Sequence, residues 1–110
     1  MRLYCIDELT QQDVTSITTR LNEMELGAGL PGLFWLPVPT ALLQDVQREH
    51  AECGPHCMAL EVLDDSLRLE LLVRARNKLR CECVAYASPE LQRHMMDYVD
   101  SLLRELSIPL

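Results

Sequence analysis

The sequence predicts an α+β domain of two layers, in which helices cover one face of a mainly antiparallel sheet. The first observation is a period of two between Cys57 and Ala87, where apolar and charged residues alternate over three consecutive runs. Such alternation is typical of strands with one buried and one solvated face. The second observation is a capped stretch of helically spaced apolar residues near each end of the chain. Together they predict the order β-α-(β)-α-β-β-β-α, with a short strand in brackets, in a single domain over 1–110.

The first half of the chain is predicted to contain two strands and two helices. Leu3–Ile6 is expected to form a strand, and Thr10 to cap a helix over 11–25. Four apolar residues of this helix recur at helical spacing: Val14, Ile17, Leu21 and Met24. Prolines limit 33–36 to an edge strand or an extended connection. A second helix is expected over 40–52, before Gly54 and Pro55.

The three alternating runs over 57–87 predict a meander of antiparallel strands. A turn at Asp64 and Asp65 places Leu60 opposite Leu69 on the buried side. The same register places Glu61 opposite Arg68 on the solvated side, where opposite charges form a favourable cross-strand pair.

The second turn of the meander is predicted to have three residues, over 76–78. This length places Val73 opposite Cys81 on the buried side. Cys81 and Cys83 then share the buried face, where thiols pack as small apolar groups.

A final helix is predicted from Ser88 onward. Ser88 is a favourable N-cap, Pro89 suits the first helical position, and Glu90 places an acid in the first turn. The expected inward stripe consists of Leu91, Met95, Tyr98, Leu102 and Leu106. The first and last helices are therefore the expected covers of the buried sheet face.

Composition and charge exclude several classes of function. The net charge of -7 argues against nucleic-acid binding, which depends on basic neutralisation of phosphates. No segment has the apolar length of a membrane span or a signal peptide, so we expect no membrane association. The five cysteines are accordingly expected to remain reduced in the cytoplasm.

One short segment contains several potential metal ligands. His50, Cys53, His56 and Cys57 lie within eight residues, and both imidazole and thiolate are good zinc ligands. Gly54 and Pro55 bend the chain between them. A zinc site at these four residues is the alternative to a helix end followed by a turn and a core strand.

No catalytic constellation is evident in the sequence. The cysteines and histidines allow many pairings, and none of them matches a nucleophile and base motif. The glycines at 27 and 29 precede Pro31 and do not open a helix after a strand, as a phosphate-binding loop requires. We therefore expect a protein without enzymatic activity and without a cofactor.

Two surface features predict association with a protein partner. The predicted second hairpin has a basic tip on an acidic chain: Arg74, Arg76, Lys78 and Arg80. Such a tip either stays solvated or meets an acidic surface. Apolar residues also interrupt the solvated sheet face or lie near it, and they are candidates for an interface: Leu72, Val84, Tyr86 and Trp35. A homodimer satisfies both features, and another protein with an acidic surface satisfies the first.

The segment from Leu67 to Leu106 resembles the C-terminal domain of flagellar hook-length control proteins. The resemblance consists of two strands with alternating charges, the Ser88-Pro89-Glu90 cap and a Leu-rich helix, and it covers less than half of the chain. The Pro- and Gln-rich N-terminal region of those proteins has no counterpart here. The leading interpretation is a small cytoplasmic protein-binding or adaptor domain that self-associates, with zinc binding as the alternative.

Overall fold

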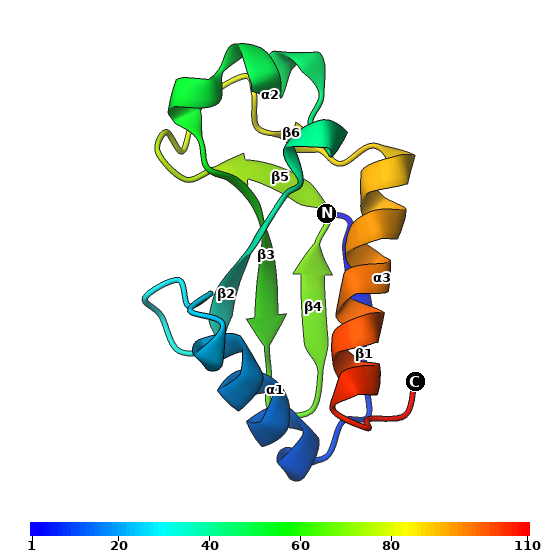
Figure 1. Ribbon diagram of the computed structural model, residues 1–110. Coiled ribbons are helices and arrows are strands. Elements are labelled where there is room, and N and C mark those ends of the chain that lie inside the picture. The colour runs from blue at the N-terminus through cyan, green and yellow to red at the C-terminus, as the bar shows by residue number, and fades with distance from the viewer.

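The computed structural model describes residues 1–110 and has the predicted two-layer α+β architecture (Figure 1). The strands are β1 (Leu3–Ile6), β2 (Leu33–Pro37), β3 (His56–Val62), β4 (Leu67–Glu70), β5 (Leu72–Ala75) and β6 (Ala85–Tyr86). The helices are α1 (Gln11–Glu23), α2 (Asp45–Glu49) and α3 (Pro89–Glu105), with 3-10 turns at Thr40–Leu42 and Ala51–Cys53. No helix is both long and apolar enough to cross a lipid bilayer.

The sheet is built around β3. One edge of β3 pairs with β2 from Cys57 to Glu61, while β4 and β5 follow each other along its other edge. All these pairings are antiparallel, and the strand order is β1-β4-β3-β5-β6. The predicted register of the first hairpin is confirmed, because Leu60 pairs with Leu69 and Glu61 pairs with Arg68.

The predicted second hairpin is wrong. Val73 pairs with Ala85 rather than with Cys81, and the third predicted strand shrinks to the two residues of β6. The connection between β5 and β6 is irregular because its backbone bonds elsewhere: Arg76 N–H donates to the carbonyl of Pro55 and Asn77 N–H to that of Cys53. These bonds hold the connection against the segment that precedes β3.

The three predicted helices occur, but the second is interrupted. Thr10 and Asp13 form the reciprocal cap of α1, which ends at Glu23, two residues earlier than predicted. In the second helix, Leu43 and Gln44 have extended backbone, and Gln44 begins α2 through a capping box with Gln47. A residue that caps a new helix cannot continue the previous one, so the predicted helix over 40–52 becomes three short turns.

The main core lies between the sheet and the two long helices. It contains 18 buried residues, among them Ile17 and Leu21 of α1 and Leu91 and Met95 of α3. The sheet contributes alternate residues to it: Phe34, Leu36, Met58, Leu60, Leu67, Leu69 and Val73. In α3 the inward stripe includes Val99, whereas Tyr98 is only half-buried. Figure 1 shows α1 at one end of the molecule, α2 with β6 at the other, and α3 running alongside the sheet between these ends.

Candidate metal centre

Four potential metal ligands converge at the α2 end of the molecule. The ligand atoms of His50, Cys53, Cys81 and Cys83 all lie within 4.8 Å of one another. The Sγ atoms of Cys53 and Cys81 are 3.7 Å apart, and Nδ1 of His50 lies 3.2 Å from Sγ of Cys81. Two thiolates bound tetrahedrally at about 2.3 Å are separated by about 3.8 Å. The 3.7 Å spacing therefore matches two thiolates of a tetrahedral centre, and His50 and Cys83 are close enough to complete a Cys₃His set.

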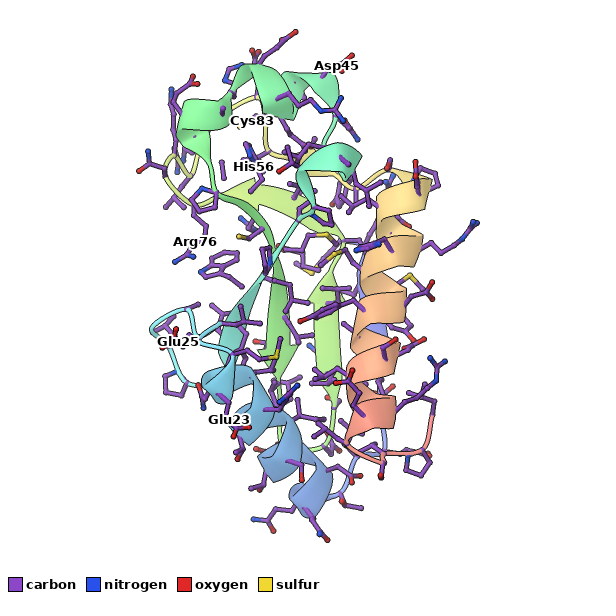
Figure 2. All side chains as sticks on the ribbon, viewed as in Figure 1. Glu23, Glu25, Asp45, His56, Arg76 and Cys83 are labelled. Atoms are coloured by element: carbon purple, nitrogen blue, oxygen red, sulfur yellow. The ribbon has the colours of Figure 1, made fainter.

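The ligands come from two segments that are distant in sequence. His50 is the C-cap of α2, and Cys53 ends the following 3-10 turn. Cys81 and Cys83 lie in a turn before β6, closed by a bond from Val84 N–H to the carbonyl of Cys81. Figure 2 shows Cys83 below α2.

Hydrogen bonds fasten these two segments together independently of the ligands. Asn77 donates its backbone N–H to the carbonyl of Cys53 at 3.0 Å and its side-chain amide to the carbonyl of Glu52 at 2.9 Å. Gln47 is fully buried and donates its amide to the carbonyl of Cys83 at 3.3 Å. The backbone on both sides of the cluster is therefore held in place by neutral groups.

The orientation of His50 suits a metal ligand. Its Nε2 lies 3.2 Å from a carboxylate oxygen of Glu82, and its Nδ1 faces the thiols. Because an ionised carboxylate only accepts hydrogen bonds, Nε2 carries the proton and Nδ1 presents its lone pair to the cluster. Metal-binding histidines are usually oriented by a carboxylate in this way.

The three thiols have different environments. The pKa of Cys81 is lowered to about 7, chiefly because its sulfur accepts the backbone N–H of Cys83. Burial raises the pKa of Cys53 and raises that of Cys83 to about 12. Cys53 and Cys83 are 3% and 0% exposed, whereas Cys81 is partly exposed. A bound cation is what would make all three sulfurs anionic at neutral pH.

The structure places the four residues of the sequence-predicted zinc site in two locations. His50 and Cys53 belong to the cluster, but His56 and Cys57 lie in β3. Cys57 pairs with Arg74 across the sheet, and His56 is buried with an unpartnered Nε2 and a pKa lowered by burial. The places of these two residues are taken by Cys81 and Cys83. The Cys-x-Cys spacing was the only sequence signal for this pair, and an apparent strand pattern concealed it.

The four residues of the predicted basic tip lie in different surroundings in the structure. Arg74 forms two hydrogen bonds with the carboxylate of Glu70, at 2.6 and 3.0 Å, on the sheet face that the long helices do not cover. The guanidinium of Arg76 lies over the ring of Trp35, 5.8 Å from its centre. Lys78 and Arg80 are exposed on the irregular connection.

The four residues predicted to form one interface lie in different parts of the structure. Leu72 pairs with Tyr86 at the β5–β6 edge, where Arg2 covers the Tyr86 ring. Val84 packs beside the thiols. Trp35 instead lines a hollow of about 460 Å³ on the open sheet face, together with the apolar residues Met1, Leu3, Leu33, Ala59 and Leu79 and the charged residues Glu61, Arg68, Glu70 and Arg74.

Comparison with models of protein families, with curated proteins and with solved structures finds no match to this chain.

Proposed function

We propose that this domain binds one Zn²⁺ ion through His50, Cys53, Cys81 and Cys83, and that the ion stabilises the fold rather than performing catalysis. The observation that carries the proposal is the mutual approach of four ligand atoms within 4.8 Å, from segments far apart in the chain. Cysteine and histidine ligands in a tetrahedral arrangement favour zinc among the common divalent cations.

The full set of protein ligands supports a structural role. Structural zinc sites are closed by four side chains, whereas catalytic sites keep one position for water or substrate. Four side chains offer one ligand atom each here, enough to complete a tetrahedron without water, and two of the thiols are buried. A zinc-bound water has no place in this arrangement.

The small number of buried apolar residues near the cluster indicates that the ion would stabilise this end of the domain. The main core contains 18 buried residues, but the second core cluster contains only Cys53, Ala75 and Cys83. So few buried side chains provide little hydrophobic stabilisation for the segment around α2 and the connection over 76–84. A metal crosslink can supply this stabilisation, because metal binding free energy contributes directly to folding.

The proposal is tested by zinc stoichiometry in purified protein. Elemental analysis is expected to give one zinc per chain for the wild type and for Cys57→Ser, a matched control that removes a buried thiol outside the cluster. Cys81→Ser and Cys83→Ser are expected to lose the ion. Equal zinc content in Cys57→Ser and Cys83→Ser would contradict the proposed ligands. We infer a cytoplasmic location on the same chemistry, because reduced thiolates are required.

A second proposal is that the domain self-associates through the open sheet face. Leu79 is 75% exposed at the rim of the apolar hollow. Arg68 and Glu61 border the same hollow, and neither has an ion-pair partner within the chain. A two-fold axis can bring Arg68 of one copy against Glu61 of the other, so a second copy is complementary in charge and in apolar surface.

Sedimentation equilibrium tests this association. We expect a homodimer at micromolar concentration that is weakened by salt, since exposed charges are screened over about 10 Å at 0.1 M. Arg68→Glu is expected to weaken the dimer, and adding Glu61→Arg to the same chain is expected to restore it. A monomer at millimolar concentration in low salt would refute the association, and the face would then remain available to an acidic partner.

A further inference from the structure

We propose that Cys53 and Cys81 form a redox-modification site, at which a hydroperoxide converts the two thiolates into a disulfide and releases the metal ion. This inference rests on the proposed zinc site and adds a means of regulating its occupancy. Hydrogen peroxide is the simplest oxidant of this class.

The distance already favours this pair. The two sulfurs are 3.7 Å apart, and a disulfide bond of about 2.05 Å requires them to approach by less than about 2 Å. Cys81 lies on an irregular connection without strand pairing, so it can make this movement while Cys53 stays in place. Cys81 and Cys83 are poorer partners, because a bond between residues two apart forces a strained ring.

The unequal exposure fixes the order of events. Cys81 is the accessible thiol of the cluster, whereas Cys53 and Cys83 are buried. A small oxidant therefore reaches the sulfur of Cys81 first, and the buried sulfur of Cys53 is the neighbour that resolves the oxidised product.

The chemistry balances with peroxide as the only co-reactant. The Cys81 thiolate attacks one peroxide oxygen, so an S–O bond forms, the O–O bond breaks and hydroxide leaves. The Cys53 thiolate then attacks the Cys81 sulfur, forming the S–S bond and expelling a second hydroxide. Two thiolates lose two electrons, and one peroxide is reduced to two hydroxide ions. Zinc stays divalent and leaves because only His50 and Cys83 still face it.

The disulfide joins the same two segments as the metal. Cys53 belongs to the segment around α2, and Cys81 belongs to the connection before β6. Oxidation therefore replaces one crosslink with another, and the α2 end of the domain remains folded in both states. The oxidation state changes the zinc content of the protein and leaves the architecture in place.

The experiment treats the zinc-loaded full chain with hydrogen peroxide. A chromogenic chelator is expected to detect one zinc released per chain, and mass spectrometry of an unreduced digest is expected to find the Cys53–Cys81 crosslink. A thiol reductant with added zinc is expected to restore the starting state. The double variant Cys5→Ser, Cys57→Ser keeps the cluster and is expected to respond like the wild type.

The outcomes separate the two proposals. Zinc that is present beforehand but stays bound after oxidation of the exposed Cys5 would overturn this inference alone, as would a crosslink between any other pair. Zinc release with Cys81 oxidised to sulfinic acid and no crosslink would also overturn it. A chain that carries no zinc before treatment would overturn the proposed function. Circular dichroism of the crosslinked protein is expected to match the zinc-bound spectrum, and unfolding on oxidation would contradict the exchange of crosslinks.

Discussion

Removal of the Glu82 carboxylate is predicted to weaken zinc binding about tenfold. This carboxylate holds the imidazole of His50 through Nε2 at 3.2 Å and keeps the Nδ1 lone pair directed at the thiols. Loss of such a partner typically lowers metal affinity by about 10–100-fold. The side chains of Glu82 and His50 are 76% and 26% exposed, so water screens their interaction. We therefore expect the lower end of the range, about 1.4 kcal/mol.

The assay is competition for zinc between the protein and a chromogenic chelator of known affinity. Glu82→Ala is compared with Glu52→Ala, which removes an exposed carboxylate beside Cys53 that makes no hydrogen bond to His50. Both variants lose one negative charge near the site, so their difference isolates the orienting hydrogen bond. Equal affinities for Glu82→Ala and Glu52→Ala would refute this reasoning.

Three further predictions concern proton release, packing and a half-buried tyrosine. Because burial raises the pKa of Cys53 and Cys83, zinc binding at pH 7 is expected to release at least two protons, measured by calorimetry in buffers of different ionisation enthalpy. In urea denaturation, Leu69→Ala is expected to lower the free energy of unfolding by about 2–5 kcal/mol and Arg68→Ala by less than about 1 kcal/mol, since only Leu69 is buried. Equal losses in the two variants would contradict the assignment of these residues to opposite sheet faces. Tyr4 donates a hydrogen bond to Asp100 at 2.6 Å, and burial followed by this bond raises its pKa to about 12, from 10.0. Tyr4→Phe is expected to cost about 1–2 kcal/mol at neutral pH. The neutral phenol is favoured by folding, so this contribution should be complete below pH 10 and disappear as the pH rises to about 12; an unchanged difference at high pH would contradict it.

The parts of the fold that sequence patterns predict correctly depend on short-range interactions. The first hairpin is joined by a short turn, so alternation and turn length together determine that Leu60 pairs with Leu69. The caps at Thr10 and Ser88 are likewise local, and both helices begin where these residues predict. The strand at 33–36 is also present, although its pairing along β3 is a long-range property that its sequence does not specify.

The errors arise where long-range contacts override a local pattern. Cys81, Glu82 and Cys83 alternate like a strand, but the connection that leads to them leaves β5 at Arg76 and Asn77, whose N–H groups bond to the segment at 53–55. The candidate site has the same origin: two of its four ligands lie 28 to 33 residues from the other two, and no spacing rule connects them. His56 and Cys57 were predicted as ligands because they are close to His50 and Cys53 in the sequence. In the fold, Cys81 and Cys83 are the residues that lie close to them.

X-ray absorption at the zinc edge of the purified protein identifies the atoms that bind the metal. A Cys₃His site predicts three sulfur neighbours at about 2.3 Å and one nitrogen at about 2.0 Å. Cys83→Ser is expected to lose the ion and therefore its zinc edge, while Cys57→Ser should leave the spectrum unchanged. A first shell of oxygen and nitrogen alone, or a sulfur shell that is lost in Cys57→Ser but retained in Cys83→Ser, would contradict the assignment of the metal centre to His50, Cys53, Cys81 and Cys83.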